Sequence, residues 1–135
     1  MPRILVVDDE EAVRTLLELM LRGDGHQVEL AESGQAGIDA VSDTPFDLVF
    51  VDLLMPGKDG MRTMAEIRRI APLLPIIAMS GMSPVHETVG EPAAAHRPAA
   101  SSAIHWLHKP FRPDRLRQVV QTALGDDPGQ QAVAT

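Results

Sequence analysis

The fold of this chain is decided by residues 3–23, RILVVDDEEAVRTLLELMLRG. The continuous apolar run from Ile4 to Val7 predicts a strand covered on both faces, as strands of parallel sheets are. A helix is expected from about Glu10 to Arg22, because its apolar residues repeat at helical spacing: Val13, Leu16, Leu17, Met20 and Leu21. A buried strand that leads directly into an amphipathic helix begins a βαβ unit, so the segment predicts an α/β fold.

The same alternation continues along the chain. Further strands are expected at residues 27–31, 47–51, 75–79 and 104–108, and further helices at about 34–42, 60–70 and 113–124. The runs at 48–51 and 76–79 are continuously apolar and predict interior strands, whereas residues 27–31 and 104–108 alternate with polar residues and predict edges. We therefore predict a doubly wound, five-stranded parallel sheet in the flavodoxin-like order 2-1-3-4-5.

Residues 82–102 break this rhythm. They contain Pro84, Pro92 and Pro98 and no clear amphipathic repeat. Because proline inside a helix costs about 3 kcal/mol, we expect an irregular fourth helix region here. One domain is expected over residues 1–124, with a disordered tail at residues 125–135.

Composition excludes several classes of protein. There is no cysteine, which removes disulfides and thiolate metal sites and suits a reducing cytoplasm. No apolar run approaches about 18 residues, so we expect neither a membrane span nor export, and a cytoplasmic location. The net charge is −7, and no basic stripe is present, which disfavours direct nucleic-acid binding.

Each of four predicted strands stops on a polar side chain: Asp8 and Asp9, then Asp52, Ser80 and Lys109. Since the carboxyl ends of parallel strands meet at one edge of the sheet, these groups should lie together. Three carboxylates without nearby cysteine or histidine favour Mg²⁺ or Mn²⁺. A carboxylate such as that of Asp52 can attack phosphorus, and an ammonium and a hydroxyl can contact the transferred phosphoryl group.

More ordinary interpretations of the same residues remain open. Glu10 and Glu11 are mainly interpreted as an acidic first helical turn, favoured by the helix dipole. Ser80 alone could cap a following helix, and Lys109 with Pro110 could form a turn at the end of a strand.

The segments ILVVDDE, LVFVDLLMPGKDG, IIAMSG and WLHKPF, in this order, resemble the defining segments of the response-regulator receiver domain, as in the chemotaxis response regulator. The resemblance covers about residues 2–124. It implies that Asp52 accepts a phosphoryl group from a histidine kinase or phosphotransfer protein. It also implies that Mg²⁺ is held by Asp9, Asp52 and the backbone carbonyl of Leu54, with Asp8 acting largely through a metal-bound water.

The resemblance further implies that Ser80 and Lys109 contact the phosphoryl group and that the bond before Pro110 is cis. Ser80 and the ring at Trp106 are the expected switch residues, although the family usually has a smaller ring there. The chain departs from the family in the long segment between Ser80 and Lys109, so we expect a remodelled signalling face.

We therefore expect a single-domain phosphoacceptor that shifts the conformation of a face for a downstream protein, with a homodimer possible. One alternative is a binding-only module that does not depend on phosphorylation. Another is an aspartyl-phosphate phosphohydrolase, which needs a second acid two residues after the nucleophile; Leu54 stands there instead.

Overall fold

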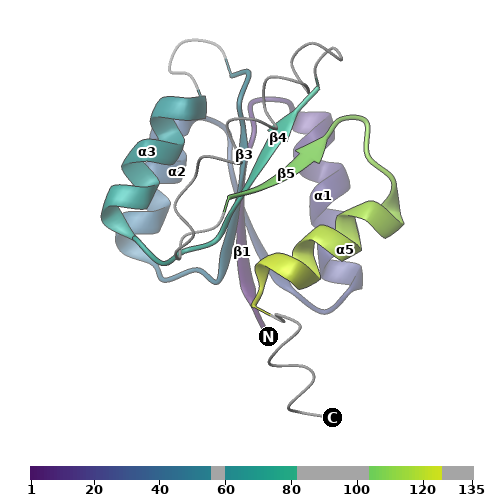
Figure 1. Cartoon of the computed structure of the whole chain (residues 1–135). Coiled ribbons are helices and arrows are strands. Elements are labelled where there is room, and N and C mark those ends of the chain that lie inside the picture. The colour runs from purple at the N-terminus through teal and green to yellow at the C-terminus, as the bar shows by residue number, and fades with distance from the viewer. Residues whose placement is uncertain (56–59, 82–103, 126–135) are drawn as a thin grey trace.

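The computed structural model describes residues 1–55, 60–81 and 104–125 (Figure 1). Its elements, in chain order, are β1 (Arg3–Val7), α1 (Glu11–Gly23), β2 (Gln27–Ala31), α2 (Gly34–Asp43), β3 (Leu48–Asp52), α3 (Gly60–Ile70), β4 (Ile76–Ser80), β5 (Ile104–His108) and α5 (Pro113–Ala123).

The strands form one parallel sheet in the order β2-β1-β3-β4-β5, which confirms the predicted topology. Strands β3 and β4 are buried along their whole length, and β1 is buried beyond its first residue. The alternating strands β2 and β5 lie at the two edges, as predicted. The register pairs Val7 with both Ala31 and Val51, so the carboxyl end of β1 lies beside that of β3.

Helices cover both faces of the sheet: α1 and α5 pack on one, and α2 and α3 on the other (Figure 1). Successive residues of β1 serve the two cores in turn, because strand side chains alternate between faces. Ile4 and Val6 pack with Leu17 of α1, whereas Leu5 and Val7 belong to the opposite core. Burying a leucine or isoleucine side chain contributes about 1.5–3 kcal/mol, so the two cores supply most of the stabilisation.

Local sequence explains how α2 begins and how closely it packs. The Ser33 hydroxyl caps the helix by accepting the Ala36 N–H at 3.1 Å. Gly37 lets α2 approach β1, because a Cβ at this position would lie 2.6 Å from Val7 Cγ2. This contact holds the helix against the strand that leads into the candidate site.

Three expectations fall partly or wholly outside the described residues: the irregular fourth helix region, the remodelled signalling face and the tail at 125–135. The domain boundaries stay a prediction. Within the described ranges, no helix has the length and apolar character needed to cross a membrane.

Candidate functional site

The sheet brings the four polar strand ends to one edge. Asp8 directly follows β1, and Lys109 directly follows β5. Asp52 and Ser80 are the last residues of β3 and β4. Each was expected to follow directly after its strand, so both strands end one residue later than expected. The backbone ladder continues past both side chains, since Leu53 N–H donates to Met79 O at 3.0 Å and Lys109 N–H to Ser80 O at 2.7 Å.

Lys109 links the carboxylates. Its Nζ lies 3.0 Å from Asp8 Oδ2, 3.3 Å from Asp52 Oδ2 and 3.5 Å from Glu10 Oε1. Burial lowers the pKa of the Lys109 ammonium, but the hydrogen bond to Asp8 and the charges of Asp8 and Asp52 outweigh this and raise it overall. The lysine is therefore charged at neutral pH. The Lys109–Pro110 bond is cis, as the resemblance implied.

Asp8 is completely buried at this edge. Its Oδ1 accepts the Glu10 N–H at 2.9 Å, and its backbone carbonyl accepts Arg14 Nη1 at 2.7 Å. Burial raises the pKa of the Asp8 carboxyl above its usual value, and the nearby Asp52 charge adds to this, whereas the bonds from Glu10 and Lys109 oppose it. An ionised Asp8 carboxylate is therefore destabilising in this buried position, and a cation that binds beside it would stabilise it.

Asp52 is 3% exposed, and both its oxygens are oriented. Oδ1 accepts the Leu54 N–H at 3.0 Å, and Oδ2 faces Lys109. Helix α3 begins directly against this strand end: a Cβ on Gly60 would overlap the Asp52 carbonyl oxygen and Leu53 Cα. Glycine is therefore required at Gly60 for the observed path of the chain around the carboxylate.

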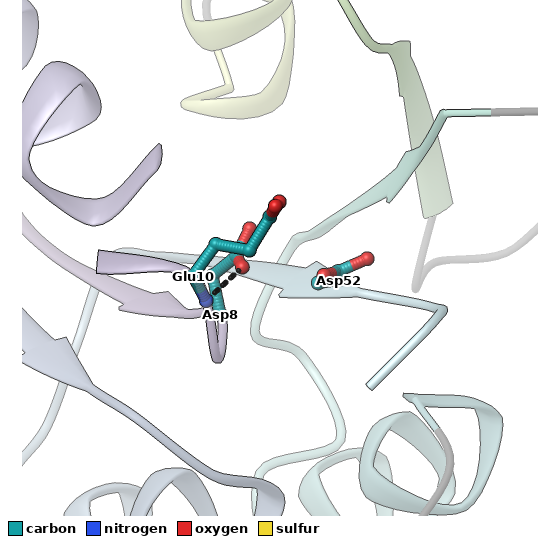
Figure 2. Close-up of side chains that lie close together, drawn as sticks. All are labelled: Asp8, Glu10 and Asp52. Atoms are coloured by element: carbon teal, nitrogen blue, oxygen red, sulfur yellow. Dashed lines mark hydrogen bonds between the residues drawn. The ribbon is translucent and has the colours of Figure 1, made fainter. Parts of the chain in front are cut away.

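Glu10 is a site residue that the sequence interpretation missed. It is the N-cap residue of α1, yet its side chain makes no capping hydrogen bond. Its carboxylate instead reaches the site, and ligand oxygens of Asp8, Glu10 and Asp52 lie within 4.8 Å of one another (Figure 2). The backbone at Glu10 is extended (φ −92°, ψ 119°), but the chain bends at Asp9, between the end of β1 and the start of α1. The two-residue spacing from Asp8 is therefore no strand-like signal, and the sequence pattern alone did not place Glu10 in the site.

A cavity of about 630 Å³ opens over these groups. The charged residues on its wall are Asp9, Glu10, Asp52 and Lys109. Its other lining residues are mostly apolar: Val13, Leu16, Leu54, Gly81, Pro110 and Phe111. Asp9 therefore faces the same cavity, although its side chain is exposed and is not part of the close three-carboxylate group. The Asp52 carboxylate is thus reached through this cavity.

The two expected switch residues lie on one face of the sheet. In the register of β4 and β5, Ser80 pairs with His108 and Ala78 pairs with Trp106. Residues two apart on a strand point to the same face of the sheet. Ser80 is completely buried, and in the described part of the chain neither its Oγ nor the buried Trp106 Nε1 has a hydrogen-bond partner. The structure places Ser80 beside Lys109 at the end of its strand, whereas Trp106 lies two residues before the end of β5; the switching role of both residues stays a prediction.

The donor set fits a small divalent cation. It consists of carboxylate oxygens, as Mg²⁺ prefers, and the Lys109 ammonium already lies where these oxygens converge. A five-stranded doubly wound sheet with an acidic pocket and a lysine at its carboxyl edge defines a phosphoacceptor signalling domain.

Comparison with known proteins identifies the family. The response regulator receiver domain model matches residues 4–121, and the chain belongs to this family. It is 40% identical over 121 residues to the transcriptional regulatory protein ZraR of Salmonella typhimurium, covering 90% of this chain and 26% of that protein. The chain thus spans about a quarter of the length of this relative.

Solved structures agree with the fold. The receiver domain of NtrX from Brucella abortus matches with a TM-score of 0.76 and 32% identity, covering 90% of this chain and 97% of that one. The receiver domain of the sensor histidine kinase PA1611 from Pseudomonas aeruginosa matches with a TM-score of 0.75 and 26% identity, over 92% and 98% of the two chains. In that structure a magnesium ion is coordinated in the active-site cleft.

Proposed function

We propose that Asp52 accepts a phosphoryl group from a histidine kinase or phosphotransfer protein. The observation that carries this is the orientation of Asp52: its carboxylate is nearly buried, held by the Leu54 N–H and Lys109 Nζ, and borders the cavity. An Asp52 oxygen attacks phosphorus while the bond from phosphorus to the donor nitrogen breaks. The electron pair of that bond leaves with the donor.

Asp8, Asp9, Asp52 and the backbone carbonyl of Leu54 are the proposed holders of Mg²⁺, or of Mn²⁺ in its place. When bound, the cation offsets negative charge on the transferred group. Lys109, whose Nζ lies 3.3 Å from Asp52 Oδ2, then contributes a second positive charge, and Ser80 can donate its buried hydroxyl to a phosphoryl oxygen. A magnesium ion in the similar PA1611 receiver domain supports this assignment.

The experiment is phosphorylation with acetyl phosphate and Mg²⁺, followed by intact-protein mass spectrometry. Wild type and Asp39→Asn, an exposed acid on α2, should gain one phosphoryl group. Asp52→Asn should gain none, because the amide is not a nucleophile of this kind. Equal labelling of Asp52→Asn would disprove the assignment.

The output is proposed to be a protein partner that binds the face changed by phosphorylation, where Ser80 and Trp106 lie. A pull-down comparing protein treated with the phosphoryl mimic beryllofluoride and untreated protein tests this. Identical captured proteins and affinities would instead favour a module that does not depend on phosphorylation.

A further inference from the structure

The charge around the cavity is strongly unbalanced. The cavity wall carries three carboxylates and one ammonium: Asp9, Glu10, Asp52 and Lys109. A fourth carboxylate, that of the buried Asp8, lies 3.0 Å from the Lys109 ammonium. Lys109 is already within 3.5 Å of three of these four acids. A small donor that enters the cavity therefore meets net negative charge before it reaches Asp52.

Glu10 is the acid whose position is explained least by the fold. As the N-cap residue it could bond the first turn of α1, but it makes no such bond. Its side chain is 62% exposed and extends to Lys109 at 3.5 Å. The Glu10 carboxylate therefore lies at the rim of the cavity. There its charge acts on solutes that approach Asp52 and does not affect the packing of the core.

We propose that Glu10 selects phosphoryl donors by their charge, disfavouring small dianionic donors and strengthening the retention of the divalent cation. This rests on the proposed phosphorylation of Asp52 and names the donor class. A donor with less negative charge, such as the phosphoramidate monoanion or a protein phosphohistidine whose ring is protonated, meets less repulsion from Glu10 than the acetyl phosphate dianion does.

Both donor reactions balance in the same way. With acetyl phosphate, the Asp52 oxygen forms its bond to phosphorus as the phosphorus–oxygen bond to the acetyl group breaks, and acetate leaves with the electron pair. With phosphoramidate, the phosphorus–nitrogen bond breaks, and the nitrogen, protonated beforehand, leaves as ammonia. Only the charge of the donor differs, so the ratio of the two rates isolates the electrostatic effect.

The expected size follows from Coulomb's law. One extra donor charge at roughly 7 Å from Glu10, in surroundings close to water, corresponds to about a threefold change in rate. The exposure of Glu10 makes this effect sensitive to salt, and it should shrink as ionic strength rises toward about 1 M. A divalent cation at the same distance carries twice the charge, so the lost carboxylate should weaken its binding roughly sevenfold.

The test compares Glu10→Gln with Glu11→Gln. Glu11 is exposed in the first turn of α1 and lies outside the three-carboxylate group, so the control changes net charge equally. Rates with acetyl phosphate and with phosphoramidate are measured at saturating Mg²⁺, and Mg²⁺ affinity is measured by calorimetry on the unphosphorylated proteins.

For Glu10→Gln we expect the acetyl phosphate to phosphoramidate rate ratio to rise about threefold and Mg²⁺ binding to weaken, with Glu11→Gln close to wild type. A ratio for Glu10→Gln equal to that of Glu11→Gln overturns the proposal, because a structural effect alone would change both donor rates together. If wild type takes no phosphoryl group from either donor, the proposed function itself has failed, which is a distinct outcome.

Discussion

Replacing Lys109 with methionine should destabilise the protein by about 2 kcal/mol when no divalent cation is present. The methionine keeps most of the stem of the side chain, so the loss comes mainly from the charge. Removing one partner of a buried ion pair costs about 3–5 kcal/mol when the remaining charge is sealed from water. Asp8 is sealed, but the cavity admits water beside Asp52 and Glu10, so we expect a smaller loss.

The loss should depend on pH. Burial already raises the pKa of Asp8, and without Lys109 the pKa rises further. A carboxyl whose pKa is raised in the folded state stabilises fully below its unfolded value of about 3.9 and loses that stabilisation as pH rises through the folded value. Lys109→Met should therefore regain stability relative to wild type as the pH is lowered from about 7.5 toward 5.

Urea unfolding with EDTA, and again with saturating Mg²⁺, measures these differences. Mg²⁺ should reduce the deficit, because the cation replaces the missing positive charge. Combining Lys109→Met with Asp52→Asn should show a coupling of about 1 kcal/mol. Arg117→Met is the control: its ion pair with Asp24 (3.5 Å) is exposed and should matter by less than about 0.5 kcal/mol. A Lys109→Met protein as stable as this control, without coupling to Asp52, would refute the reasoning.

Three further predictions test the same edge of the sheet. Mg²⁺ at ten times its dissociation constant should stabilise wild type by roughly 1.4 kcal/mol in thermal unfolding, and should stabilise Asp52→Asn far less. Gly60→Ala should cost about 3 kcal/mol in urea unfolding because of the overlap with Asp52 and Leu53, whereas Gly23→Ala, where a Cβ meets nothing within 4 Å, should be neutral or slightly stabilising. Ser80→Ala should raise the free energy of unfolding by up to about 1 kcal/mol, because it removes a buried hydroxyl that has no partner among the described residues. It should also reduce beryllofluoride-dependent partner binding, and a stability loss above about 1 kcal/mol would contradict this.

The sheet could be predicted from sequence because burial leaves a direct pattern. The continuous apolar runs became the interior strands, and the alternating segments at Val28 and Trp106 became the edges. The exact strand ends could not be predicted in the same way. Hydrogen bonds between strands use the backbone, so a polar side chain such as Asp52 or Ser80 does not stop pairing, and both strands run one residue further than expected.

The site was predictable where a single strand end determines position, as at Asp8, Asp52 and Lys109. Glu10 was harder, because an acidic residue before a helix has an ordinary explanation in the helix dipole. Its role depends on the backbone angle at one loop residue and on Lys109, which is 99 residues away in the chain. Only the folded arrangement shows that the Glu10 side chain serves the cavity and not the helix end.

The same features that suit this edge to phosphoryl chemistry make it unfavourable when unliganded. Asp8 is fully buried near Asp52, and Ser80 Oγ is buried with no hydrogen-bond partner in the described residues. In the proposed function, a bound cation would relieve the first cost, and a phosphoryl oxygen that accepts from Ser80 would relieve the second. Because both costs disappear only when ligand is present, their free energy is available to favour the phosphorylated conformation. Substitutions that stabilise the unmodified protein here, such as Ser80→Ala, should therefore weaken the response to phosphorylation.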